Sequence, residues 1–436
     1  MSPDTRIRPH PPGIATYLRK RAVLEPWWIT GSPGQLFRAA VVIPALAEYA
    51  NLRHTLQTLA SNPPELLAQT LILVVVNQCC DASPAERADN LATLGALTHW
   101  KRDLGLEHLH WVDAASSGIE LPAKQGVGLA RKIGLDLALT RLDFSAGDPL
   151  LICLDADTLV QPDYLGALTT HFAACNAGGA SIPFCHRPAG DRPGQAAIDR
   201  YELFLRVYVL GMELAGSPYA FHTVGSAMAC RASAYTASGG MNRRQAGEDF
   251  YFLQQLHKTS AVAALSGTIV HPSPRSSHRV PFGTGRAVGD MLAPGGGELL
   301  FYQPLLFGIV GEWLMCVAEH GGADGSSLLE RAGEISPHLR TYLEAAGFRE
   351  AWDNLLRNNR DGQRLMGSFH GWFDAFRTMR LMHHLTDCAY PRIPAEKAVP
   401  PLLARAGLDG PADLGGMIKC MRRLQGVRVW QEKGNS

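Results

Sequence analysis

The sequence predicts an α/β fold in which helices cover both faces of a mostly parallel sheet, followed by a helical C-terminal region. Short runs of branched aliphatic residues alternate with segments that have a helical apolar period. Uninterrupted apolar strands that alternate with helices are typical of parallel sheets buried on both faces. The predicted strands are 39–44, 71–77, 109–112 and 150–154, and the predicted helices between them are about 47–61, 84–96 and 124–140.

The chain of 436 residues is long enough for two or three domains. Residues 1–36 are rich in Pro, Arg and His and are expected to form an N-terminal arm. Residues 37–286 form the predicted α/β domain, with a helix at 195–214 and a strand at 261–270. Residues 287–436 are expected to be mostly helical.

Composition excludes several classes of protein. The formal net charge is +1, so no global charge favours nucleic acid. The nine cysteines show no regular spacing, which favours free thiols in a reducing, cytoplasmic compartment. The longest apolar stretch, 299–318, contains polar and Gly positions, so we expect a core helix and no transmembrane segment. Peripheral contact with a membrane through an interfacial helix stays open.

Two aspartates directly follow the predicted strand at 150–154. Asp155 and Asp157 are separated by one residue, and side chains at i and i+2 of an extended chain point the same way. Paired carboxylates suit Mg²⁺ or Mn²⁺, which leave room for substrate phosphates. The alternative is a solvated turn or a helix cap.

A second acidic pair, Glu248 and Asp249, begins the apolar run Phe250–Leu253. This pattern indicates a helix N-terminus, where acids commonly complement the helix dipole. The functional interpretation is a general base that accepts the proton of a hydroxyl group.

A predicted helix within 123–138 carries the third signal. Lys124, Gly128 and Arg131 have the spacing of one helical face, and the glycine would let a phosphate or sugar approach the backbone. An ordinary solvated basic face is the alternative.

His271 follows the predicted strand at 261–270, and a long loop rich in Pro, Gly and Ser follows it at 273–286. Imidazole is a good ligand for Mn²⁺-like ions, and Arg275 and Arg279 suit a diphosphate. A surface histidine before a basic loop is the alternative.

These motifs together resemble family 2 glycosyltransferases of the GT-A fold over roughly residues 38–285. The resemblance is carried by Val41-Val42-Ile43-Pro44 with Glu48, by Leu154-Asp155-Ala156-Asp157, by Gly126-Val127-Gly128-Leu129-Ala130-Arg131, and by Gly239-Gly240 followed by Glu248-Asp249. Four motifs in the family's order are more specific than any one of them.

The resemblance implies a nucleoside-diphosphate sugar donor and a divalent cation. By position, Pro44, Ala45 and Glu48 would lie near the nucleoside, Asp155 and Asp157 would hold metal and ribose, and Asp249 would be the base. The family usually has an aspartate after the second strand, where it reads uracil, and this chain has Asn77. An amide offers both a donor and an acceptor, so the choice between uridine and guanosine stays open.

We therefore predict a metal-dependent, inverting glycosyltransferase whose acceptor is an unidentified small molecule, glycan or lipid, with the C-terminal helices as a candidate acceptor-binding region. A retaining GT-A enzyme is an alternative. A nucleotidyltransferase is disfavoured because Ala45-Leu46-Ala47-Glu48, not a glycine-rich basic loop, follows the first strand. A non-catalytic binding protein is disfavoured because Asp155, Asp157 and Asp249 are all present.

Overall fold

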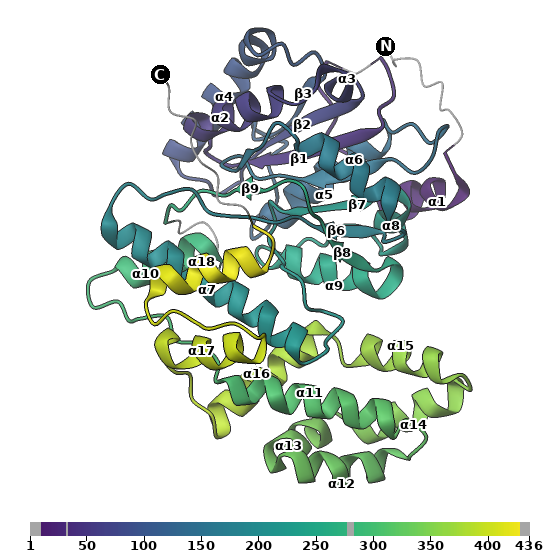
Figure 1. Cartoon of the computed structure of the whole chain (residues 1–436). Helices are drawn as coiled ribbons and strands as arrows, with labels where there is room; N and C mark the ends of the chain where they lie inside the picture. The colour runs from purple at the N-terminus through teal and green to yellow at the C-terminus, as the bar shows by residue number, and fades with distance from the viewer. Residues whose placement is uncertain (1–9, 32–33, 277–282, 428–436) are drawn as a thin grey trace. The chain divides into compact units, whose positions relative to one another are not determined.

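The computed structural model describes residues 10–31, 34–276 and 283–427, which divide into two units (Figure 1). The first unit takes in Met1–Pro188, Thr223–Arg286 and Gly426–Ser436, as far as these are described. The second unit takes in Ala189–His222 and Ala287–Gln425. The boundaries differ from those expected from the sequence, because residues 189–222 associate with the helical region that follows 287.

A seven-stranded sheet forms the centre of the first unit, in the order β3-β2-β1-β4-β7-β6-β8. The strands are β1 Ala39–Ala45, β2 Thr70–Asn77, β3 Leu109–Ala114, β4 Leu150–Cys153, β6 Gly179–Ser181, β7 Met228–Arg231 and β8 Val262–Ala264. Strands β1 to β4 pair in parallel, as do β6 and β8, whereas β7 is antiparallel to both β4 and β6. The predicted mostly parallel sheet is confirmed.

The order of strands contains a reversal next to β1. The chain runs from β1 to β2 and β3 on one side, and then returns to β4 on the other side of β1. Ligands of open α/β sheets bind beyond the carboxyl ends of the strands at such a reversal. The residues that follow β1 and β4 therefore mark the expected binding site.

Helices of the first unit cover both faces of this sheet. They are α1 Pro12–Lys20, α2 Tyr49–Ala60, α3 Pro64–Leu67, α4 Pro84–Asp103, α5 Val127–Leu139, α6 Tyr164–Ala174, α8 Ala232–Ala237 and α9 Glu248–Ser260. Right-handed crossovers put α2 and α4 on one face and α5 on the other, because the direction of strand progression reverses after β3. Helix α5 packs on β1, β2 and β4, and its thirteen residues are almost all buried.

The predicted strand at 261–270 is wrong as a single element. Strand β8 ends at Ala264, and β9 Val270–His271 pairs with β5 Leu159–Val160 in a separate two-stranded sheet. Gly267 between them has φ +96°, a conformation that ends an extended strand. The consequence is that His271 lies opposite Leu159, two residues after Asp157.

The expected N-terminal arm is partly helical and packed. Helix α1 begins after Pro11 and buries Ile14 and Tyr17, and it contacts α8 of the same unit. The Pro-rich composition did not reveal this helix, because only two of its residues, Ile14 and Tyr17, are buried.

Apart from a single antiparallel bridge between Phe301 and Ile393, the regular elements of the second unit are helices among its described residues, as the sequence predicts for the region after 287. Its helices are α7 Arg192–Leu214, α10 Thr284–Leu292, whose first turn precedes the boundary, α11 Pro304–Glu319, α12 Gly325–Ile335, α13 Pro337–Ala345, α14 Phe348–Asn358, α15 Gly362–Trp372, α16 Ala375–Cys388, α17 Ala395–Arg405 and α18 Leu414–Leu424. The apolar stretch at 299–318 supplies α11, whose Trp313 and Phe307 are fully buried. No helix in the described part of the chain has the length and apolarity needed to cross a membrane.

We predict that Gly134→Ala destabilises the first unit although alanine is the better helix former. A Cβ atom at Gly134 would lie 2.4 Å from Cγ1 of Val42 and 2.8 Å from Cγ2 of Val75, where α5 meets the sheet. Overpacking of this kind costs about 1–3 kcal/mol of unfolding free energy. Urea denaturation measures the change.

The matched control is Gly95→Ala in α4, where an added Cβ would meet nothing within 4 Å. This variant should gain about 0.5–1 kcal/mol from helix propensity alone. Equal effects of the two substitutions would contradict the close approach of α5 to β1 and β2.

Candidate active site

A cluster of charged side chains lies at the carboxyl edge of the sheet, where the strand order reverses. Glu48 follows β1, Asp155 and Asp157 follow β4, and Glu248 and Asp249 form the first turn of α9. Except for Asp249, each of these carboxylates is in an ion pair with an arginine that comes from another part of the chain.

Arg131 on α5 connects the two acidic motifs. Its Nη2 donates to Oδ1 of Asp155 and its Nη1 donates to Oε1 of Glu248, and its side chain is only 3% exposed. A Cβ atom on Gly225 would lie 2.5 Å from the guanidinium group, so only glycine leaves room for it. Arg131, Asp155 and Glu248 are thus in contact in the structure, and their roles in a site stay predictions.

A second arginine, Arg275, connects the other two carboxylates. Its Nη2 contacts Oε1 of Glu48 and lies 2.9 Å from Oδ2 of Asp157. Arg187 is adjacent, with its Nη2 donating to the backbone oxygen of Asp157 at 3.2 Å. Sequence reasoning missed Arg187, because it follows the short strand β6 within a segment that carries no motif. Arg279 lies outside the described residues.

Burial shifts the titration of the two acids that begin α9. Burial raises the pKa of Glu248 to about 7, with Asp249 and Asp155 adding to the rise and Arg131 opposing it. Burial also raises the pKa of Asp249. Both acids at the start of α9 thus lie in an environment that favours their neutral forms.

Arg131 itself stays charged. Burial lowers the pKa of its guanidinium group, but Asp155 and Glu248 outweigh burial and raise it. Its Nε atom is buried without a hydrogen-bond partner among the described residues. The ion pairs therefore compensate for placing a cation inside the protein.

The residues present fit a divalent cation that takes few protein ligands. Asp155 is about a third exposed and Asp157 a fifth, so both carboxylates can be reached from solvent. Mg²⁺ commonly uses one or two carboxylates and completes its shell with phosphate oxygens and water. Within the described ranges, no three His, Cys, Asp or Glu side chains form a group that could hold a metal.

His271 is buried and oriented by hydrogen bonds. Its Nδ1 lies 3.0 Å from the carbonyl oxygen of Cys185, to which it donates, so Nε2 is the acceptor nitrogen of the neutral ring. Nε2 lies 3.4 Å from Nε2 of Gln161, which follows β5. A backbone carbonyl on Nδ1 is a common way to orient a metal-binding histidine, but coordination by His271 stays a prediction.

A network of side-chain amides joins the carboxyl ends of β1, β2 and β3. Asn90 on α4 accepts from Ala47 N and donates to the carbonyl of Asn77 and to Oε1 of Gln78. Gln78 in turn donates to the carbonyl of Ala115, after β3.

Asn77 is buried, and its Oδ1 has no hydrogen-bond partner among the described residues. This acceptor is available to a ligand with an N–H group. Pro44 and Ala45, the last two residues of β1, are also buried.

Contrary to the prediction from the sequence, Lys124 and Gly128 do not lie on a shared helical face with Arg131 that is open to a ligand. Helix α5 begins at Val127, so Lys124 lies before it, exposed and with φ +61°, and shares no helical face with Arg131. A Cβ atom on Gly128 would lie 2.3 Å from the backbone oxygen of Arg244. The space left by this glycine is thus filled by the chain itself and not by a ligand.

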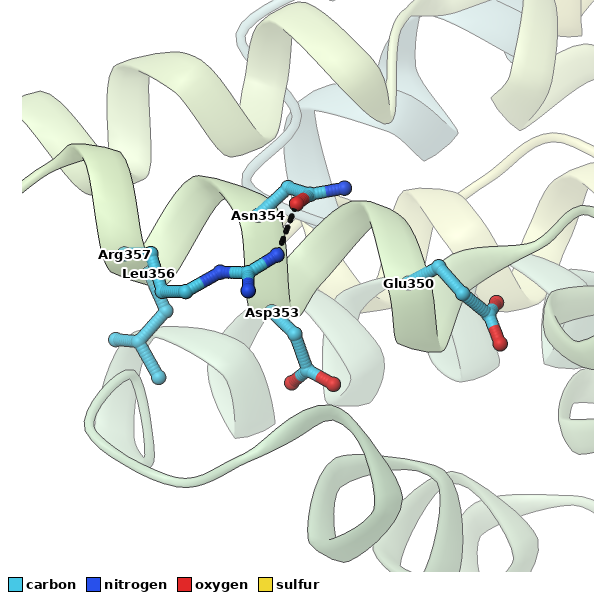
Figure 2. A pocket seen from close by; sticks show the side chains of 5 residues that line it. All are labelled: Glu350, Asp353, Asn354, Leu356 and Arg357. Atoms are coloured by element: carbon cyan, nitrogen blue, oxygen red, sulfur yellow. Dashed lines mark hydrogen bonds between the residues drawn. The ribbon is translucent and has the colours of Figure 1, made fainter.

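An open hollow of about 430 Å³ lies elsewhere, on helix α14 of the second unit (Figure 2). Glu350, Asp353, Asn354, Leu356 and Arg357 line it, and all come from this one helix. Asp353 accepts the backbone N–H of Gly325 at 2.8 Å, and Arg357 donates to Asn354. Its polar side chains thus already have partners within the protein, so the hollow is not the candidate site.

No protein family's sequence profile and no curated protein sequence matches the chain. Among solved structures it is similar to residues 1–349 of TarS from S. aureus in complex with UDP-GlcNAc (11% identity, TM-score 0.37), covering 89% of this chain and 92% of that one. The mannosyltransferase PcManGT from Pyrobaculum calidifontis, in complex with GDP-Man and Mn²⁺, aligns at 14% identity and TM-score 0.36, covering 83% and 93%.

A third similar structure is glucosyl-3-phosphoglycerate synthase from Mycobacterium tuberculosis, in complex with Mn²⁺, UDP and glucosyl-3-phosphoglycerate. It aligns at 15% identity and TM-score 0.33, covering 61% of this chain and 76% of that one. At such identities and TM-scores the alignments establish no shared activity.

We predict that Arg131→Met destabilises the protein strongly above pH 7 and less in acid. Removing one partner of a buried ion pair costs about 3–5 kcal/mol, because the remaining charge is uncompensated. The raised pKa means that folded protein holds a proton on Glu248 below about pH 7, so the missing cation matters less there. Urea denaturation at pH 5.5 and pH 8 measures the difference.

The control is Arg340→Met, which removes the exposed pair between Arg340 and Glu344 at 2.8 Å. An exposed pair contributes little, so this variant should unfold like the wild type at both pH values. A loss in Arg131→Met that is the same at pH 5.5 and pH 8 would contradict the protonation of Glu248.

Proposed function

We propose that this protein is a metal-dependent glycosyltransferase that moves a sugar from a nucleoside-diphosphate donor to an acceptor hydroxyl with inversion. The observation that carries the proposal is the charged cluster at the strand-order reversal, where Arg131 joins Asp155 to Glu248 and Arg275 joins Glu48 to Asp157. A site of this composition suits a divalent cation together with an anionic ligand.

Two groups of residues at this edge of the sheet suit the two ends of a nucleotide sugar. Asn77, with its unpartnered Oδ1, and the buried end of β1 at Pro44 and Ala45 provide a place for the nucleobase. Arg275 and Arg187 near Asp157 provide guanidinium groups, which pair with phosphate oxygens in bidentate fashion. Asp155 and Asp157 would hold the cation, with phosphate oxygens and water completing its shell.

A divalent cation, when bound, neutralises charge on the diphosphate and on the departing nucleotide. The side chains of the protein orient the donor around it. Arg275 bridges Glu48 and Asp157, so it can exchange a carboxylate for a phosphate partner without leaving the site. This exchange would couple binding of the donor to release of Asp157.

Asp249 is the better candidate for the general base of the two acids. Glu248 is held by Arg131, and its carboxylate faces into the protein at 4% exposure of the residue. Asp249 is half-buried and accepts a hydrogen bond from the adjacent Phe250 N at 2.7 Å. Burial raises its pKa, which makes it a stronger base.

In the proposed reaction, the acceptor oxygen attacks the anomeric carbon as the bond to the diphosphate oxygen breaks. Asp249 takes the proton from the acceptor hydroxyl, and the nucleoside diphosphate leaves with the bonding electrons. One displacement at the anomeric carbon inverts its configuration. Glu248 acts as a positioning residue through its ion pair with Arg131.

We predict that the wild-type protein is stabilised by UDP or GDP with Mn²⁺, and that Asp157→Ala abolishes this stabilisation. A ligand at about 100 times its Kd adds roughly 2.7 kcal/mol to the free energy of unfolding. Thermal unfolding with each nucleotide, with Mn²⁺ alone, and with both plus EDTA measures the effect.

The control is Asp81→Ala, which removes an exposed aspartate four residues after β2. It should leave the nucleotide effect intact. Full stabilisation by nucleotide in EDTA would exclude a metal-dependent donor site.

We predict that Asp249→Asn keeps the binding of nucleotide and metal but lowers the rate of transfer. Loss of a general base typically lowers kcat by about 10²–10⁴-fold. The rate is measured as nucleoside diphosphate release in the presence of candidate acceptor mixtures, and NMR of the product gives its anomeric configuration. A product with the donor's configuration would exclude the inverting mechanism, and an unchanged kcat would exclude Asp249 as the base.

A further inference from the structure

A buried polar network joins helix α1 to α5, the helix that carries Arg131. Asp136 on α5 is fully buried, and its Oδ1 accepts from the hydroxyl groups of Tyr17 and Tyr235, each at 2.7 Å. Its Oδ2 accepts from Val23 N at 2.7 Å and pairs with Lys132 at 2.9 Å. Four donors from three segments thus converge on one carboxylate, five residues after Arg131.

Tyr17 has two further contacts in this network. Its hydroxyl accepts from Nζ of Lys132 at 2.8 Å, and Lys132 directly follows Arg131 in α5. A Cβ atom added to Gly240 would lie only 1.9 Å from the oxygen of the same hydroxyl group. Gly240 has φ +78°, so both its conformation and the space beside it require glycine. Tyr17 therefore contacts both α5 and the Gly-Gly turn.

The Gly-Gly turn begins the segment 239–247, which leads directly to Glu248 and Asp249. Arg21, just after α1, lies 2.9 Å from a Cβ position on Gly239. Further along, Asn242 donates from Nδ2 to the carbonyl of Glu248 at 2.8 Å. The start of the segment therefore rests on α1, and a side chain within it holds the first turn of α9.

The other side of this segment packs on the N-terminus of α5. A Cβ atom on Gly128 would lie 2.3 Å from Arg244 O, and one on Gly126 would lie 3.4 Å from the backbone of Gln245. The segment is thus confined between α1 and α5. We expect a shift of either helix to move the segment, because there is no room for even a methyl group beside Gly240 at α1 or beside Gly128 in α5.

We infer that α1 is a clamp that sets the geometry between Arg131 and the Glu248-Asp249 pair, with Tyr17 as its positioning residue. The clamp acts on two points at once, Lys132 beside Arg131 and the turn that precedes Glu248. The expected effect of α1 on catalysis rests on the proposed function. The confinement of segment 239–247 by Tyr17 is a structural inference that is independent of the proposed function.

The test compares Tyr17→Phe with Tyr235→Phe in the full-length chain. Each variant removes one 2.7 Å hydrogen bond to the same oxygen of Asp136 and keeps its buried ring, so the loss of stability should be similar. Only Tyr17→Phe also removes the hydrogen bond from Lys132, which keeps its ion pair with Asp136, and the hydroxyl contact with the Gly-Gly turn. Tyr235 on α8 is therefore the matched control.

Two measurements separate a positioning role from a structural one. The first is the kinetics of transfer, in which Tyr17→Phe should lower kcat by on the order of 10-fold with an unchanged donor KM, because a small misplacement near the chemistry is costly. The second is the rate of trypsin cleavage at the exposed Arg243 and Arg244, which should rise severalfold in Tyr17→Phe and not in Tyr235→Phe.

Equal kcat values and equal cleavage rates in the two variants would overturn the inference. If the wild-type protein shows neither nucleotide binding nor transfer, the proposed function fails, and cleavage at Arg243 and Arg244 decides the structural part alone. Faster cleavage in Tyr17→Phe than in Tyr235→Phe then supports the clamp, and equal cleavage removes it.

Discussion

The ion pairs of Arg131 with Asp155 and Glu248 organise the first unit around its charged edge. A buried guanidinium group needs carboxylates within hydrogen-bond distance, and these two come from residues 24 and 117 positions away in the chain. Their meeting requires β4 beside β1 and α9 beside α5. It also requires Gly225, because any larger residue would collide with the guanidinium group. The ion pairs of Arg131 thus depend on the strand order, on the packing of α9 beside α5 and on Gly225.

The charge of this edge opposes stability, which is a common property of functional sites. A protein selected only for folding would leave these carboxylates in water. Here Glu248 is buried, and its pKa is raised to about 7 by burial together with its acidic neighbours. The structure keeps these groups together because packing elsewhere, such as the buried strands β1 and β2, provides the necessary stabilisation. In the function proposed above, the same carboxylates and arginines would bind the cation and the phosphate groups of the donor.

Much of the site could be predicted from local patterns, but not its pairings. Asp155 and Asp157 follow an apolar strand, and Glu248 begins an apolar helix, so the sequence shows that both pairs lie at ends of elements. The glycines near Arg131 misled the helix assignment: Gly126 is the residue before α5, and Gly128 admits the backbone of Arg244. Arg187 escaped detection because its partner, the carbonyl of Asp157, is a backbone group with no sequence signature. The polar contacts of Tyr17 were equally invisible, since they join three helices.

The sequence by itself determined the positions of the first four strands and of the helices between them, because uninterrupted apolar runs and helical periods are local properties. It also determined the helical character of the region after 287. Only the tertiary structure decided that β7 enters the sheet antiparallel, that β9 pairs with β5 beside Asp157, and that α7 joins the second unit. It alone decided which arginine meets which carboxylate. These outcomes depend on contacts between distant segments, whose energies a local pattern of residues does not contain.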